Sequence, residues 1–175
     1  MPAPVIFIAL LLSFSAVADE GLYLTAGIGL GGAEVKPAFQ ADNRHERSDT
    51  FDLGIMLGYR FSNNLQIEAG HISHGTLDVF GMADRSSMSE NVITIGYAFE
   101  LAPASRIIPR VGHSAWRFES TEGTFLNPGN EAQSSATGNE TIFSVTLTYS
   151  DFFLTYQSNH YDFGQFSTWL VGFEF

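Results

Sequence analysis

The chain has 175 residues, no Cys and a formal net charge of −11, from 8 basic and 19 acidic residues. This length suits a single domain, and the lack of Cys excludes disulfides and Cys-based metal sites. Because acidic residues outnumber basic ones, the sequence contains no stripe of Lys and Arg that could bind phosphate groups, and we expect no nucleic-acid partner. Beyond residue 18 no apolar run approaches the roughly 20 residues of a transmembrane helix, which excludes a helical membrane protein.

The first 18 residues have the pattern of an export signal. Residues 5–12 (VIFIALLL) form an apolar core, and residues 16–18 (AVA) have the small-x-small form of a cleavage site. No Lys or Arg precedes the apolar core, so only the α-amino group supplies positive charge there. We therefore predict a signal peptide over residues 1–18 and an exported domain over residues 19–175.

Eight stretches of this domain alternate between apolar and polar or small residues, which predicts amphipathic β-strands. The clearest runs from Phe51 to Phe61, where bulky apolar residues alternate with Asp52, Arg60 and glycines. The least regular contains Pro109, a residue that marks an edge, a bulge or a strand start. The predicted strands cover residues 21–35, 51–61, 65–74, 92–100, 106–119, 141–149, 152–161 and 168–175.

The connections between these strands differ in length. Residues 36–49, 75–89 and 120–139 are polar and predict long loops, whereas the remaining connections are short. Long outer loops and short periplasmic turns are typical of outer-membrane barrels. A soluble lipocalin-like barrel is the alternative, but it would have to place these bulky apolar faces inside a small lumen. The sequence therefore predicts an all-β, eight-stranded antiparallel up-and-down transmembrane barrel.

The last predicted strand, residues 168–175, shows the alternation of apolar and polar or small residues most strongly. Trp169, Val171, Phe173 and Phe175 fall on one face of a strand with a side-chain period of two, while Glu174 and small residues occupy the other. We expect the bulky aromatic face to meet lipid and the opposite face to line the lumen.

The order of motifs resembles the OmpA-like transmembrane domain family. The matching stretches are GLYLTAGIGLG (residues 21–31), FDLGIMLGYRFSNNLQIEAGH (51–71), ITIGYAFELA (93–102), RVGHSAWRFES (110–120) and LTYQSNHYDFG (154–164). The resemblance spans nearly all of residues 20–175. It implies an eight-stranded barrel in the bacterial outer membrane, without the carboxyl-terminal peptidoglycan-binding domain of larger members, so we do not expect a role in cell-wall anchoring.

The same resemblance implies a polar, mostly plugged lumen held together by charged pairs. The candidates for this charge cluster are Asp52, Arg60, Glu68, Arg110 and Glu174. It also implies outer-membrane lipid and lipopolysaccharide as partners, and recognition of the closing strand Trp169–Phe175 by the barrel-insertion machinery. The implied function is structural or surface-interacting and non-enzymatic, with no cofactor.

An enzymatic alternative rests on His71 and Ser73, which share the lipid face of the third predicted strand. Lipid A deacylases of the PagL type are eight-stranded barrels that use a His-x-Ser pair and an acidic residue on the outer surface, with His as base and Ser as nucleophile. The match is partial, because Glu90, the nearest acidic residue on the following strand, is predicted to point inward. Ser158 and His160 form a similar pair in the reverse order.

A narrow pore is the third possibility, since an eight-stranded interior can be filled by side chains. No metal site is expected, because His71 and His74 fall on opposite strand faces. Several aromatic residues are predicted to form belts at the membrane interfaces. They are Tyr97, Trp116, Tyr149, Tyr156, Tyr161 and Trp169.

Overall fold

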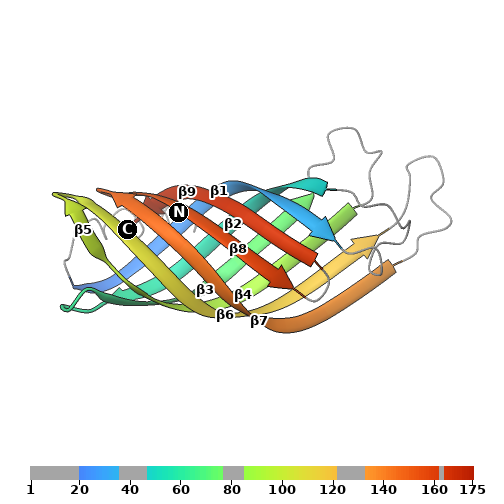
Figure 1. Cartoon of the computed structure of the whole chain (residues 1–175), viewed down its shortest axis with the longest axis horizontal. Helices are drawn as coiled ribbons and strands as arrows, with labels where there is room; N and C mark the ends of the chain where they lie inside the picture. The colour runs from blue at the N-terminus through green and yellow to red at the C-terminus, as the bar shows by residue number, and fades with distance from the viewer. Residues whose placement is uncertain (1–19, 36–46, 77–84, 122–132, 162–163) are drawn as a thin grey trace, which may run out of the picture.

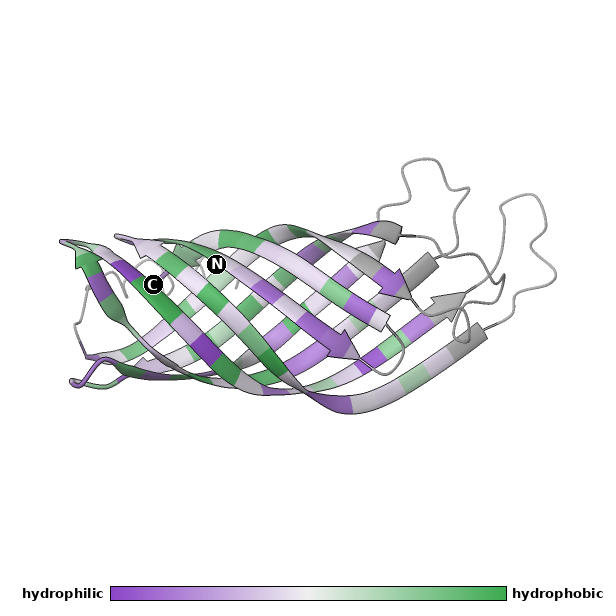
Figure 2. Cartoon of the chain, viewed as in Figure 1, coloured by the Kyte–Doolittle hydropathy of each residue, from purple (hydrophilic) through white to green (hydrophobic). Residues whose placement is uncertain are grey.

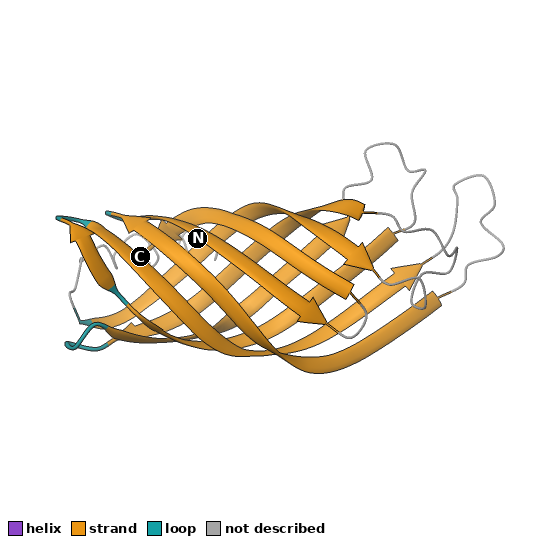
Figure 3. Cartoon of the chain, viewed as in Figure 1, coloured by secondary structure: helices purple, strands orange, loops and turns teal. Residues whose placement is uncertain are grey.

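The computed structural model describes residues 20–35, 47–76, 85–121, 133–161 and 164–175, which form a single antiparallel sheet (Figure 1). Strands and short turns make up this part of the chain (Figure 3). None of the described residues forms a helix long and apolar enough to cross a membrane. The strands are β1 (Gly21–Val35), β2 (Arg47–Arg60), β3 (Leu65–Thr76), β4 (Arg85–Tyr97), β5 (Phe99–Ala102), β6 (Ser105–Thr121), β7 (Gln133–Tyr149), β8 (Phe152–Tyr161) and β9 (Gly164–Glu174).

The sheet closes on itself because β1 pairs with both β2 and β9. At the seam, the backbone N–H of Leu24 donates to the carbonyl of Phe175 over 2.9 Å, and the N–H of Phe175 donates back over 2.8 Å. The segments β4 and β5 are interrupted only at Ala98 and both pair with β6, so together they form one barrel strand. The predicted eight-stranded antiparallel barrel is confirmed.

The register of the pairs gives the barrel its shear. Cross-strand partners followed once around the barrel from Gly21 lead back to β1 at Gly31, ten residues further along. Eight strands with this offset tilt by about 40° and enclose an interior that side chains can fill. The path passes Arg60, Gln66, Gly96, Arg110, Ser144, Gln157 and Thr168.

The outer surface carries the apolar faces of the strands. Hydrophobic residues are concentrated on the part of the barrel near the short turns, and hydrophilic residues become more frequent toward the other end (Figure 2). Aromatic residues gather near the short turns, where Tyr59 lies 4.8 Å from Phe61 and Tyr97 lies 4.8 Å from Phe99 between ring centroids. Such a band with an aromatic girdle is the surface that a bilayer requires.

Two of the predicted belt residues lie elsewhere. Trp116 and Tyr161 point into the barrel and are buried, so the prediction that they belong to an interface belt is wrong. Both residues sit where the strands have left the apolar band, and there an inward aromatic side chain fills the lumen. The other four predicted belt residues, Tyr97, Tyr149, Tyr156 and Trp169, are exposed on the outer surface.

Several strands are also longer than the hydrophobic alternation predicted. β4 begins at residue 85 rather than 92, and β7 begins at residue 133 rather than 141. β2 and β9 also begin earlier than predicted, at residues 47 and 164. These extensions are polar on the outward face, as at Ser87 and Asn139. Backbone pairing continues there although the alternation of hydrophobicity has ended.

Glycines at the seam allow the close approach of β1 and β9. A Cβ atom added to Gly29 would lie 2.1 Å from the carbonyl oxygen of Trp169, a backbone atom that cannot move without opening the pair. At Gly54 the nearest atom to an added Cβ is the Leu170 Cδ1 at 3.3 Å, which belongs to a flexible side chain.

We therefore predict that Gly29→Ala lowers the free energy of unfolding by about 2 kcal/mol or more, because the seam must open. Gly54→Ala is the matched control and should have little effect. Urea unfolding of the refolded protein in detergent measures both values. Equal stability of the two variants would contradict the tight seam.

Candidate functional site

The lumen begins, at the end with the short turns, with an ion pair. Arg60 Nη2 lies 2.7 Å from Glu174 Oε1, which joins β2 to the closing strand β9. The Arg60 guanidinium carbon also lies 5.1 Å from the centroid of the Tyr23 ring, within the range of a cation–π contact. The Arg60 side chain is buried and that of Glu174 is 17% exposed.

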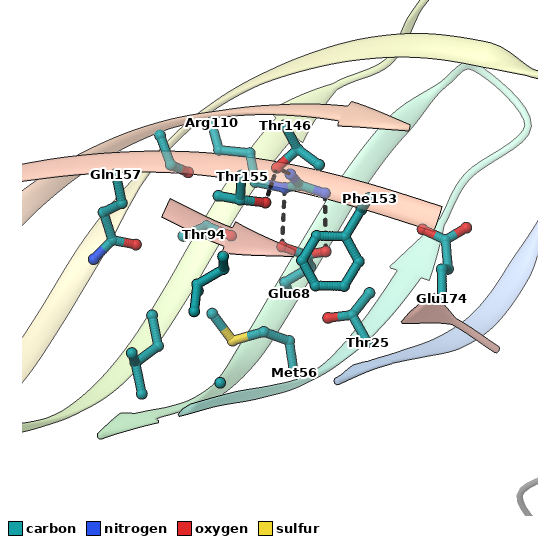
Figure 4. A pocket seen from close by; sticks show the side chains of 14 residues that line it. Thr25, Met56, Glu68, Thr94, Arg110, Thr146, Phe153, Thr155, Gln157 and Glu174 are labelled. Atoms are coloured by element: carbon teal, nitrogen blue, oxygen red, sulfur yellow. Dashed lines mark hydrogen bonds and ion pairs between the residues drawn. The ribbon is translucent and has the colours of Figure 1, made fainter. Parts of the chain in front are cut away.

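A second ion pair lies next to the first. Arg110 Nε lies 2.9 Å from Glu68 Oε2, and its Nη2 donates to Glu68 Oε1 over 2.9 Å (Figure 4). The Tyr23 hydroxyl donates to the same Glu68 oxygen over 2.9 Å, and Gln66 Oε1 accepts a hydrogen bond from Arg110 over 3.0 Å. Arg110 Nη1 also donates to the Thr146 hydroxyl. The hydrogen bond from Arg110 Nη2 to Glu68 is charge-assisted, which makes it stronger than a bond between neutral groups.

An apolar layer crosses the lumen beyond these ion pairs. It consists of the buried side chains of Ile72, Val92, Ile142, Phe153 and Leu170, with Met56 packed against them. Each comes from a strand position that the alternation assigns to the inward face. The layer separates the two ion pairs from a second polar group further along the barrel.

This second group centres on His74. Its Nδ1 lies 2.9 Å from Asp52 Oδ1, and its Nε2 lies 2.8 Å from Glu90 Oε1. The Ser114 hydroxyl donates to the other Glu90 oxygen over 2.7 Å, and Thr168 donates to Asp52. A neutral imidazole has one N–H only, so the two contacts require either an imidazolium or one protonated carboxyl group.

A second apolar cluster covers the His74 group on the side away from the ion pairs. Its members are Met88, Trp116, Phe118, Tyr161 and Phe166. The Phe166 ring lies 5.9 Å from the His74 ring between centroids, so this cluster packs directly on the polar group. The lumen is therefore a stack of alternating polar and apolar layers.

The five residues of the predicted charge cluster all lie in the barrel interior, in three separate groups. Arg60 pairs with Glu174, Glu68 pairs with Arg110, and Asp52 lies beyond the apolar layer with His74. The separation follows from position along the strands, because Arg60 is the last residue of β2 whereas Asp52 lies well before it in the same strand, nearer the other end of the barrel.

Sequence reasoning missed three ionisable members of these groups, namely Tyr23, His74 and Glu90. The signal for each was its place on the inward face, since His74 alternates with the outward His71 and Glu90 with the outward Asn91. Their partners lie on other strands, at sequence separations of 45, 22 and 16 residues. Those pairings follow from the register, which alternation alone does not give.

The His71–Ser73 pair lies on the outer surface, as the alternation predicts. His71 Nδ1 lies 3.0 Å from Asn91 Oδ1 on the neighbouring strand. Glu90 points inward and is fully buried, where it contacts His74 and Ser114. The acidic residue that a His-x-Ser hydrolase would need beside His71 is therefore directed away from it. Ser158 and His160 also share the outward face, and Asn159 between them points inward.

Among the described residues, no group of three or more His, Cys, Asp and Glu is arranged to hold a metal ion. In the Asp52–His74–Glu90 group, both ring nitrogens of His74 are already engaged in hydrogen bonds with the two carboxylates.

A sequence model of the OmpA-like transmembrane domain matches residues 18–163. The chain belongs to this family. Its members are β-barrels of the bacterial outer membrane, and the closed eight-stranded fold agrees with that membership. No curated protein sequence is significantly similar to the chain.

Solved barrels share the fold at low sequence identity. The Neisserial surface protein A is 14% identical, with a TM-score of 0.65 over 88% of this chain and 96% of that one. The Ail attachment invasion locus protein of Yersinia pestis, solved in complex with the heparin analogue sucrose octasulfate, is 15% identical, with a TM-score of 0.51 over 89% and 99%. The amino-terminal barrel of Pseudomonas aeruginosa OprF is 14% identical, with a TM-score of 0.52 over 89% and 98%. These likenesses concern the fold alone.

We predict that breaking the buried Arg110–Glu68 ion pair lowers the free energy of unfolding more than breaking the exposed Arg117–Glu119 pair. Arg110→Met leaves Glu68 as an uncompensated buried charge, which costs about 3–5 kcal/mol. Arg117→Ala breaks the 2.7 Å pair of Arg117 with Glu119, in which both side chains are more than half exposed, and should cost less than about 1 kcal/mol.

The double variant Glu68→Met with Arg110→Met removes both charges and should be less destabilised than Arg110→Met alone. Urea unfolding in detergent measures all three variants. A double variant less stable than the single one would contradict the assignment of the cost to an unpaired charge.

Proposed function

We propose that this protein is a non-enzymatic outer-membrane barrel whose structural or surface-interaction role is carried by the end opposite the short turns. The observation that supports this proposal best is the filled lumen. The pocket in the lumen lined by Glu68, Arg110 and Leu170 has a volume of about 40 Å³, whereas sites for small molecules occupy roughly 300–1,000 Å³ (Figure 4). A functional surface is therefore expected outside the lumen.

The β6–β7 hairpin is the main feature of that end. Its two strands pair along their full length, from Ser105↔Tyr149 to Thr121↔Gln133, whereas β8 pairs with β7 only as far as Phe143. Within the described residues, the β7 backbone from 133 to 142 thus has a strand on one side only. Figure 1 shows the hairpin running past the end of β8. A free strand edge is a surface to which an extended peptide can add.

Shortening the hairpin tests this role. Residues 119–135 can be replaced by Asn-Gly, because Phe118 and Ala136 face each other and a two-residue turn can join them. We expect the shortened barrel to fold, since it keeps every residue of the two apolar clusters, Phe118 included. Cells displaying it should attach less to a coat of serum proteins than cells displaying the intact protein.

Heat-modifiable migration in gels provides the control that the shortened barrel is folded. Equal attachment of both kinds of cell would contradict a role for the hairpin. If neither kind of cell attached, the surface-interaction role would be excluded for these proteins and only the structural role would remain.

The absence of enzymatic activity is part of the proposal, and Glu90 supports it because this carboxylate is buried away from His71. We expect the refolded protein to leave the acyl chains of lipopolysaccharide intact, as judged by mass spectrometry. Release of an acyl chain by the wild type that disappears in Ser73→Ala would establish the deacylase instead. Ser158→Ala serves as the second control.

We further propose that residues 1–18, which lie outside the described residues, direct export, and that the insertion machinery recognises Trp169–Phe175. The backbone of Phe175, not its ring, makes the seam hydrogen bonds with Leu24. Phe175→Ala should therefore refold normally in detergent yet accumulate less in the outer membrane of cells. Equal accumulation would argue against recognition of this ring. Lipopolysaccharide and outer-membrane lipid are the proposed partners of the apolar outer band.

A further inference from the structure

The His74 ring in the second polar group of the lumen has a carboxylate on each side. Asp52 and Glu90 are fully buried, and one oxygen of each faces a ring nitrogen, over 2.9 Å to Nδ1 and 2.8 Å to Nε2. Their other oxygens accept hydrogen bonds from the hydroxyl groups of Thr168 and Ser114. These two hydroxyl protons are therefore not available for the contacts with the ring.

The two contacts with the ring each need a proton, because two lone pairs do not form a hydrogen bond. A neutral imidazole carries one N–H, and two ionised carboxylates carry none. The folded group thus holds one proton more than the same three side chains hold in water near pH 8. An imidazolium between two carboxylates and a neutral imidazole beside one carboxylic acid satisfy this count equally, so the proton belongs to the group as a whole.

The positive charge of this proton is not duplicated by a cationic side chain. Within the described residues, neither Asp52 nor Glu90 pairs with a Lys or an Arg. Arg110 pairs with Glu68 on the other side of the apolar layer. The two carboxylates that face His74 therefore depend on the proton for compensation of their charge.

The described strands around the group bring neutral or acidic side chains to it. Tyr161 of β8 interacts with Glu90 through its phenol group. Glu140 of β7 falls on the inward face at the position paired with Ser114, and its Oε1 accepts a hydrogen bond from the N–H of Thr141 over 3.2 Å. The residues that approach the carboxylates from β1, β2, β6 and β9 are uncharged, namely Gly31, Thr50, Ser114 and Thr168.

We propose that Asp52, His74 and Glu90 form a proton-binding site, which takes up one proton when the barrel folds and releases it in alkaline solution. Burial supports the site, because the apolar layer lies on one side of the group and the second apolar cluster lies on the other. Like charges that face each other in such surroundings repel more strongly than they do in water. This inference does not depend on the proposed surface role.

The site connects five strands at the end of the barrel opposite the short turns. The ring links β2, β3 and β4, and the hydroxyl groups of Ser114 and Thr168 add β6 and β9. Loss of the proton leaves one ring nitrogen and one carboxylate facing each other as two acceptors. Release of the proton therefore weakens the connection between these strands, and alkaline solution loosens this end of the barrel.

Urea unfolding of the refolded wild-type protein in detergent, measured at several pH values, tests the proposal. Because the folded barrel holds one proton more than the unfolded chain, a rise in pH favours unfolding. We expect the unfolding equilibrium constant to increase about tenfold between about pH 7.5 and pH 8.5, where an unfolded His is neutral. An equilibrium constant that stays the same over this interval would overturn the proposal.

Glu90→Gln keeps every hydrogen bond of the group without the additional proton. Its amide can donate to His74 Nε2 and accept from Ser114, while the neutral ring donates to Asp52. We expect the unfolding equilibrium constant of this variant to change less than about twofold over the same interval. His113→Gln is the matched control, because His113 is exposed on the outward face of β6, and this control should keep the tenfold increase.

Asp52→Asn provides the same test on the other side of the ring, and it keeps the proposal testable if Glu90→Gln fails to fold. Its amide can donate to His74 Nδ1 and accept from Thr168, so the pH dependence should disappear here as well. A tenfold increase that persists in either amide variant would place the proton elsewhere and overturn the proposal. Loss of the increase in His113→Gln would do the same.

Discussion

The structure depends on closure of the barrel between β1 and β9. A strand inside a bilayer must find all its hydrogen bonds within the protein, because lipid offers none. The seam meets this requirement to the end of the chain, where Leu24 and Phe175 exchange both backbone hydrogen bonds. Glycines such as Gly29 let the two strands approach, since a side chain there would meet a backbone carbonyl.

Closure with eight strands and an offset of ten fixes a narrow interior, and the side chains then have to fill it. They do so in layers. The two ion pairs form a neutral group, with Arg60 opposite Glu174 and Arg110 opposite Glu68, whereas the His74 group lies between two apolar clusters. Charges buried in this way are tolerated because each is paired and hydrogen-bonded. An interior of this kind leaves no room for a substrate, which directs attention to the exposed end of the barrel.

Alternation of apolar and polar residues predicts much of this fold, because a lipid-facing strand has to be apolar on every second residue. The same rule placed Asp52, Glu68 and Arg110 on the inward face. The rule does not mark where strands begin outside the bilayer, and for that reason β4 and β7 begin earlier than predicted. Trp116 obeys the rule, because it shares the inward face of β6 with Arg110, and the prediction of an interface belt overlooked this. The rule also gives no register, so the partner of His74 and the division of the charges into three groups could not be predicted.

The apolar layers close the lumen, and single-channel recording tests this closure most directly. Refolded wild-type protein, with insertion checked by its heat-modifiable migration, is added to planar lipid bilayers under an applied voltage. We expect no current steps, because an apolar layer obstructs the path through the lumen. The layer contains Ile72, Val92, Ile142 and Leu170. Steady, reproducible steps from the wild-type barrel would contradict this closure and would establish the narrow pore.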